Sequence, residues 1–190
     1  MLDNTYANVK TMPALALRGL VCFPGVMLHF DVGRKKSIKA LNAAMESGQR
    51  IFLVAQKNVY DEEPGGEEIY DIGCVARICQ ILRLSDNSVK VLVEGLYRAS
   101  TVELEDNGSF LTARIKKCEI PLVKNRKVYL ETLARKIRNE FEHYASKGIK
   151  LAPDIASTVA SNDDVGFLAD FISFNIPVPV DDKQFVLEQL

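Results

Sequence analysis

The clearest pattern in the chain is a strict alternation of apolar and polar positions over residues 26–32. The apolar positions are Val26, Leu28, Phe30 and Val32, and Met27, His29 and Asp31 lie between them. A period of two predicts a β-strand that buries one face and exposes the other. Residues 12–18 and 51–56 predict two further short strands, and residues 69–120 predict three long antiparallel strands.

Helical periodicity appears first in residues 33–48, between two of the predicted strands. Apolar residues recur there on one helical stripe, made of Ile38, Leu41, Ala44 and Met45. Gly48 follows at the place where a glycine commonly ends a helix. The segment therefore predicts one helix of about three turns.

From Pro121 onwards the pattern is helical throughout. A long helix is expected from about Val123, with an apolar stripe of Leu130, Leu133, Ala134, Ile137, Phe141 and Tyr144. Pro153 is expected to open a short helix, and Asn162 or Asp163 to cap the next one. Asp181 is expected to start a last helix, after an extended connector at residues 176–179.

This order of elements predicts an α+β fold with two lobes. The first is a curved antiparallel sheet or partly closed, PUA-like barrel with one helix, and the second is all-α. The expected boundaries are a flexible tail at residues 1–11, a β-rich lobe at 12–120 and a helical lobe at 121–190. The last helix reaches the end of the chain without a glycine cap or a basic last turn, so the helical lobe is expected to be truncated there.

The stretch VCFPGV, residues 21–26, raises the question of whether Cys22 is a nucleophile or part of a bend. A nucleophilic thiol needs a base within hydrogen-bond reach, and the chain contains only His29 and His143. Pro24 and Gly25 supply the backbone angles that the two central positions of a type II turn require. The stretch is therefore predicted to be a corner between two strands.

Composition and charge narrow the possible functions. No apolar stretch approaches the roughly 20 residues that span a bilayer, and the first residues do not resemble a secretion signal, so a cytoplasmic protein without a membrane partner is expected. The four cysteines form no CxxC pair, which argues against a zinc site and predicts reduced, mostly buried thiols. The net charge is −1, but Lys and Arg are in excess between residues 115 and 150.

Several stretches, taken in order, resemble the amino-terminal domain of the Lon family of ATP-dependent proteases. They are LRGLVCFPGVMLHFDVGRKKSIKAL, IFLVAQK, IGCVARICQILRLSDNSVKVLVEGLYRA, DDVGFLADFI and DDKQFVLEQL. The resemblance extends over residues 12–190. It implies a longer natural protein, in which this domain precedes an ATPase module and a Ser-Lys protease module assembled as a hexameric ring.

The resemblance implies that this chain is a non-catalytic part of such an enzyme. It would recognise unfolded, damaged or tagged proteins and support ring assembly. The sequence contains no G-x-x-x-x-G-K-[ST] phosphate loop, so no cofactor is expected in this fragment, whereas ATP and Mg would serve the full-length family member. No catalytic or metal-binding residues are predicted.

A surface that selects unfolded chains is expected to be apolar and exposed. Phe23, Met27 and His29 are predicted to border this surface, because Met27 and His29 lie on the outer face of their strand and Phe23 precedes the corner. The alternative is that the three residues pack beneath the helical lobe.

Two other functions remain open at this stage. A PUA-like lobe and the basic excess in residues 115–150 are compatible with nucleic-acid binding. However, the cations are not interleaved with stacking aromatic residues, so any such binding is expected to be weak or absent. A stand-alone Lon-like adaptor is the third possibility.

Overall fold

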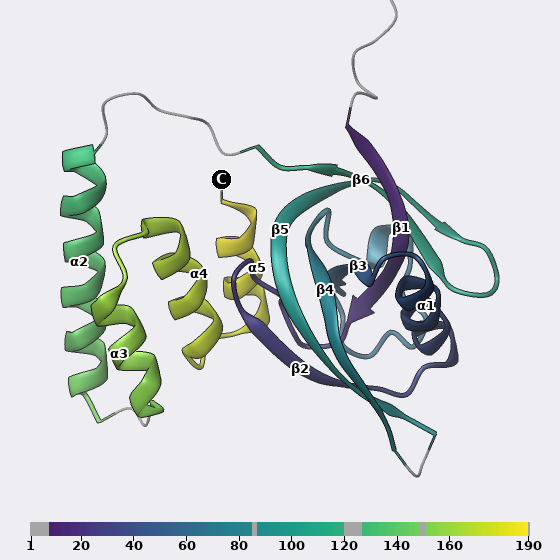
Figure 1. The fold of residues 1–190 in the computed structure, drawn as a ribbon, viewed down its shortest axis with the longest axis horizontal. Helices are drawn as coiled ribbons and strands as arrows, with labels where there is room; N and C mark the ends of the chain where they lie inside the picture. The colour runs from purple at the N-terminus through teal and green to yellow at the C-terminus, as the bar shows by residue number, and fades with distance from the viewer. Residues whose placement is uncertain (1–7, 85–86, 120–126, 149–150, 190) are drawn as a thin grey trace, which may run out of the picture. The chain divides into compact units, whose positions relative to one another are not determined.

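The computed structural model describes residues 8–84, 87–119, 127–148 and 151–189. The chain divides into two compact units, Met1–Glu119 and Ile120–Leu190. We call them the β-rich unit and the helical unit, and each is described by itself. Figure 1 labels the helices and strands of both.

Over the residues that the structure describes, the β-rich unit is a six-stranded mixed sheet with one α-helix and one short 3-10 helix. Its elements are β1 (Val9–Leu17), β2 (Met27–Val32), α1 (Lys35–Glu46), β3 (Arg50–Ala55), η2 (Gly66–Glu68), β4 (Ile72–Arg83), β5 (Val89–Asp106) and β6 (Leu111–Lys117). The strand order is β2-β5-β4-β3-β1-β6, and β6 also pairs with β5 (Figure 1). Because of this last pairing, five strands close into a ring and β2 lies outside it, paired to β5.

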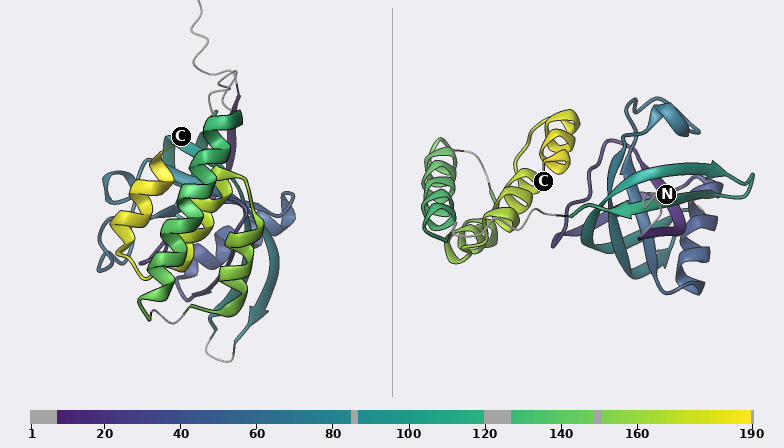
Figure 2. Two further views of the ribbon diagram at one scale, coloured as in Figure 1. Left: turned by 90° about the vertical axis from the view of Figure 1, so that its left-hand side faces the viewer. Right: turned by 90° about the horizontal axis from the view of Figure 1, so that it is seen from above.

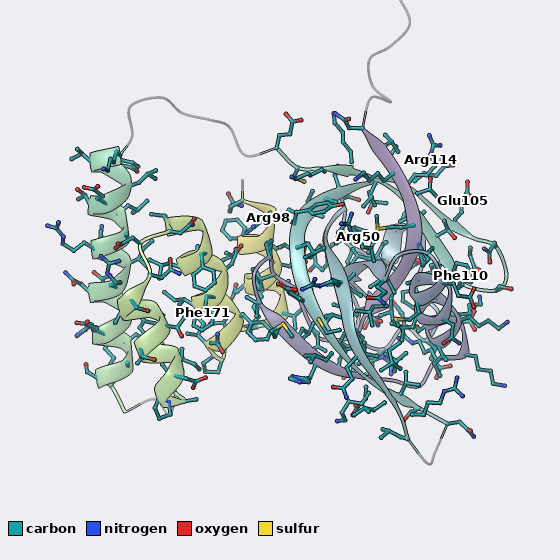
Figure 3. The ribbon with its side chains drawn as sticks, viewed as in Figure 1. Arg50, Arg98, Glu105, Phe110, Arg114 and Phe171 are labelled. Carbon is teal, nitrogen blue, oxygen red and sulfur yellow. The ribbon has the colours of Figure 1, made fainter. Side chains whose placement is uncertain are left out.

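The long strand β5 makes this closure possible. Its first half pairs with β2 and with most of β4, and its second half pairs with β6 from Ala99 to Asp106. Arg114 of β6, which is labelled in Figure 3, forms an ion pair with Glu103 of β5 at 2.5 Å in this second half. The curved, partly closed sheet predicted from the sequence is confirmed.

Two details predicted for the β-rich unit are wrong. The sheet is not wholly antiparallel, because β1 pairs with β3 in parallel from Ala14 to Leu17. Parallel neighbours require a long crossover, which β2 and α1 provide between them. The expected tail of residues 1–11 is also too long, because Val9, Lys10 and Thr11 already pair with β6; residues 1–7 lie outside the described residues.

Helix α1 packs against β1, β3 and β6 and lies along one side of the curved sheet (Figure 2). It buries Ala40, Leu41 and Ala44, whereas Met45, predicted on the buried stripe, is 41% exposed. Gly48 follows the C-cap residue Ser47 in the position predicted for a helix-ending glycine, and its φ is +97°. The N–H of Gln49 donates to the carbonyl of Ala44 at 2.8 Å, which is the six-residue closing bond of a Schellman cap.

The ring of five strands encloses an apolar core. Most of its members are alanine or β-branched residues, and Phe52 contributes a large aromatic side chain. The core consists of Ala14, Ala16, Phe52, Val54, Ile69, Val75, Ala99, Ala113 and Ile115. Because this interior is filled by side chains, function has to be sought at the edges and outer faces of the sheet.

The helical unit contains α2 (Lys127–Ser146), α3 (Pro153–Ser161), α4 (Val165–Asn175) and α5 (Val180–Glu188). The predicted start of the long helix at Val123 lies outside the described residues. Pro153 opens α3 as predicted. The cap of α4 is Asp164 rather than Asn162 or Asp163, since its carboxylate accepts the N–H of Phe167 at 2.8 Å.

Helices α2, α3 and α4 contact one another and surround a small core of their own (Figure 2). Ala134, Phe141, Val159 and Leu168 are its buried members. Along α4, Phe171, which is labelled in Figure 3, stacks with Phe167, and their ring centroids are 5.3 Å apart. The helical unit therefore has its own apolar packing.

Candidate functional site

The corner at residues 21–26 is fixed to strand β5 by two backbone hydrogen bonds. The N–H of Gly25 donates to the carbonyl of Gly95 at 2.9 Å, and the N–H of Gly95 donates to the carbonyl of Val26 at 3.0 Å. Gly25 has a φ of +72°, the conformation predicted for it. The corner is thus a structural bend that leads into β2.

The predicted exposure of Phe23 is wrong, because its relative exposure is 0%. The backbone of Phe23 lies so close to Gly95 that a Cβ atom on Gly95 would be 2.0 Å from the Phe23 carbonyl oxygen. A glycine inside a strand pattern signals such a close approach, so Gly95 was the available clue. Phe23 is consequently excluded from an accessible binding surface.

Cys22 is also buried, beside the thiol of Cys74. Its hydrogen bond to Cys74, together with burial, raises the pKa of the Cys22 thiol well above its ordinary value. Because the thiolate is the reactive form, Cys22 is held in its unreactive state. The four cysteines are free as predicted, but Cys79 is exposed and only Cys22 and Cys74 are fully buried.

Strand β2 places Met27 and His29 on an exposed face, as the alternation predicts. Met27 is 45% exposed, and His29 and Asp31 are exposed as well, while Leu28 and Phe30 are buried. The structure therefore separates the three predicted site residues: Met27 and His29 stay on one accessible strand face, and Phe23 does not.

Neighbouring side chains on β5 extend this exposed face. Glu94, Leu92 and Lys90 lie opposite Met27, His29 and Asp31 in the strand register. Lys90 pairs with Asp31 at 3.1 Å, and Glu94 pairs with Arg77 of β4. We call the surface made by Met27, His29, Asp31, Lys90, Leu92 and Glu94 the β2–β5 face. It combines an apolar pair, Met27 and Leu92, with carboxylates whose charges are matched by neighbouring cations.

A cleft of about 390 Å³, lined by both charged and apolar residues, lies elsewhere on the β-rich unit, at the first turn of α1. Lys36 in this cleft pairs with Glu63 at 2.9 Å and with Asp106 at 2.7 Å. Arg34 donates to the carbonyl of Asp61 and to the side chain of Gln56, both at 2.9 Å. These contacts use the cations to hold the 57–68 loop in place, so the cleft is not an open anion-binding site.

Over the residues that the structure covers, no cluster of three or more His, Cys, Asp or Glu side chains has the arrangement of a metal site. In the same residues no helix has the length and apolar character needed to cross a membrane. The β2–β5 face carries two of the three predicted site residues, Met27 and His29, and is the candidate binding surface.

The family model for the substrate-binding domain of the ATP-dependent protease La (LON) matches residues 11–190. The chain belongs to the Lon substrate-binding domain family. It is 41% identical over 177 residues to the Lon protease of Erwinia amylovora and 38% identical over 183 residues to that of Heliobacterium modesticaldum. These alignments cover 93% and 96% of this chain but only 22% of each relative.

The fold agrees with this assignment. The N-terminal domain of the Mycobacterium avium complex Lon protease superposes with a TM-score of 0.71 at 15% sequence identity, covering 94% of this chain and 90% of that one. The chain thus corresponds to the Lon substrate-binding domain, about a fifth of the length of the Lon proteases that it matches. The resemblance noted from the sequence is confirmed.

Proposed function

We propose that this chain is the non-catalytic recognition domain of a Lon-type ATP-dependent serine protease and binds unfolded or damaged polypeptides. The observation that carries the proposal is the match of a substrate-binding domain model to nearly the whole chain, residues 11–190. The substrate of a protease is a polypeptide. A recognition domain must therefore present a surface on which segments of many different proteins can lie.

The β2–β5 face is the surface that we propose for this contact. Met27 and Leu92 offer apolar contact, and methionine adapts its shape to different partners because it is unbranched and polarisable. Unfolded chains expose apolar residues that folded proteins bury, so an exposed face of this kind distinguishes between the two.

The same proposal extends to the full-length protein. By resemblance to the Lon family, the domain would support assembly of a hexameric ring in the cytoplasm. ATP and Mg²⁺ would then be bound by other modules of that protein, since this sequence has no phosphate loop.

Binding of a fluorescently labelled unfolded protein such as reduced casein, followed by fluorescence anisotropy, tests the proposal. Met27→Ser combined with His29→Ser should weaken binding about tenfold while the melting temperature stays within a few degrees. The matched control is Val102→Ser, which removes a side chain that is 46% exposed on β5, outside the stretch that pairs with β2. Unchanged binding by the folded double variant would reject the β2–β5 face, whereas no binding by the wild type would reject the recognition function.

Nucleic-acid binding is the alternative function, and the basic excess in residues 115–150 is the observation behind it. On α2, Lys127 lies 4.0 Å from Glu131, and Arg138 pairs with Asp163 at 2.7 Å. These neighbours reduce the local positive charge, so any binding through phosphate contacts should be weak and should be lost as salt is added. A complex with a single-stranded oligonucleotide that persists at physiological salt and resists competitor would favour this alternative.

A further inference from the structure

Strand β2 is at the end of the sheet order, and among the described strands it pairs with β5 alone. The N–H of Gly95 donates to the carbonyl of Val26, so position 26 directs its backbone groups toward β5. Along a strand of an antiparallel pair, the backbone groups of successive residues point alternately toward the partner strand and away from it. The N–H and C=O groups of Leu28, Phe30 and Val32 therefore also point toward β5. The N–H and C=O groups of Met27, His29 and Asp31 consequently point away from it.

These outward groups make β2 a template for another strand. Within the described part of the chain, the outward backbone groups of Met27, His29 and Asp31 have no hydrogen-bond partner. They provide three donors and three acceptors along a strand of six residues, about 20 Å long. Proteins usually protect such an edge, and an unprotected one pairs readily with an added strand.

The free edge continues into a cavity of about 380 Å³ at the end of β2. On the opposite side of this cavity lies β1. Its pairing with β6 ends at Ala14, so among the described strands residues 15–17 pair with β3 alone. The lining is mainly apolar, with charged groups also present: Leu15, Ala16, Leu17, Arg18, Leu20, Phe30, Asp31, Val32, Gly33, Arg34 and Ser37. A chain lying along β2 would pass this cavity and could place one apolar side chain in it.

We propose that an extended segment of an unfolded polypeptide adds to the free edge of β2 as a further strand of the sheet. Backbone hydrogen bonds supply the affinity, and the cavity between β1 and β2 accepts an apolar side chain. This inference rests on the proposed recognition function and specifies how it operates. Every polypeptide has the same backbone, so recognition by strand addition tolerates many sequences, which suits a substrate-binding domain of a protease.

The decisive comparison is between two substitutions at one position. His29→Pro removes an outward N–H and obstructs an added strand, whereas His29→Ala removes only the side chain. A proline at an outward-facing position of an edge strand does not remove a hydrogen bond of the sheet itself. Binding of labelled unfolded casein should be at least about tenfold weaker in His29→Pro than in His29→Ala, because both variants lose the imidazole and only the proline also loses the backbone N–H.

A second measurement does not depend on how the proline variant folds. A labelled peptide of about ten residues with alternating Leu and Thr should bind the wild-type chain. The same peptide with every central backbone nitrogen methylated keeps its side chains but loses its N–H donors, and it should bind at least about tenfold more weakly.

The results separate this mode of binding from the proposed function itself. Equal affinity for both peptides, or equal losses of casein affinity in folded His29→Pro and His29→Ala, would overturn strand addition. Casein binding by the wild type would still uphold the recognition function. If the wild type binds neither casein nor the peptide, strand addition and the recognition function are both overturned. A concentration-dependent dimer that disappears in His29→Pro would instead assign the edge to a second copy of this chain and reject the proposal.

Discussion

Replacement of Gly95 by alanine should strongly destabilise the β-rich unit. The added Cβ would lie 2.0 Å from the carbonyl oxygen of Phe23 and 3.2 Å from the sulfur of Cys74. A carbon–oxygen contact needs roughly 3.3 Å, so the corner would have to move by more than about 1 Å. Because the obstructing atom belongs to the backbone, a side-chain rotation cannot relieve the clash.

The expected loss of stability has two parts. Forcing a methyl group into a filled site costs about 1–3 kcal/mol. Displacing the corner also weakens the two hydrogen bonds between Gly95 and the Gly25–Val26 backbone, each worth roughly 1 kcal/mol. The sum is about 3–5 kcal/mol, a large part of the roughly 5–15 kcal/mol by which a domain is stable.

Urea denaturation followed by far-UV circular dichroism measures this loss. With a slope of roughly 2 kcal/mol per molar urea, the midpoint should fall by about 2 M. Gly65→Ala is the matched control, because no atom lies within 4 Å of its Cβ position and its φ of −150° suits alanine. Similar midpoints for Gly95→Ala and Gly65→Ala would refute the argument that the corner packs directly on Gly95.

Two further predictions concern titratable groups. The Lys36 ammonium lowers the pKa of the Asp106 carboxyl. The pair therefore stabilises the fold above the pKa that Asp106 has in the unfolded chain, and this contribution is lost as the pH falls through the pKa of Asp106 in the folded protein. In Lys36→Met, carboxyl NMR should find a higher Asp106 pKa, and an unchanged pKa would contradict the pairing. For the thiols, iodoacetamide labelling followed by mass spectrometry should modify the exposed Cys79 first and the half-buried Cys118 later. The buried Cys22 and Cys74 should be labelled only after denaturation. Early labelling of Cys22 would contradict its burial.

The sequence predicts best those features that depend on neighbouring residues. The alternation in β2 correctly identified Leu28 and Phe30 as buried and Met27 and His29 as exposed, because strand geometry alone decides which face each side chain occupies. The C-terminal cap of α1 at Gly48 was equally local, since only the conformation of that residue was needed.

Features that depend on distant partners were missed or misplaced. The burial of Phe23 depends on Gly95, which is far along the chain and becomes its neighbour only when β2 pairs with β5. The parallel pairing of β1 with β3 likewise depends on how the intervening segment crosses the sheet. The cap at Asp164 was missed by one residue, because residues 162–164 all carry side chains suited to capping and the sequence pattern does not choose among them.

The closure of the ring also constrains how the protein can be synthesised. Strand β1 pairs with β6 from Val9↔Lys116 to Ala14↔Leu111, so the first and last strands of the β-rich unit are neighbours. A ribosome releases the chain from its amino terminus, and β1 therefore emerges long before its partner exists. Until residues 111–117 have left the exit tunnel, one edge of β1 stays unpaired, and folding of this unit has to wait for nearly all of it to be translated.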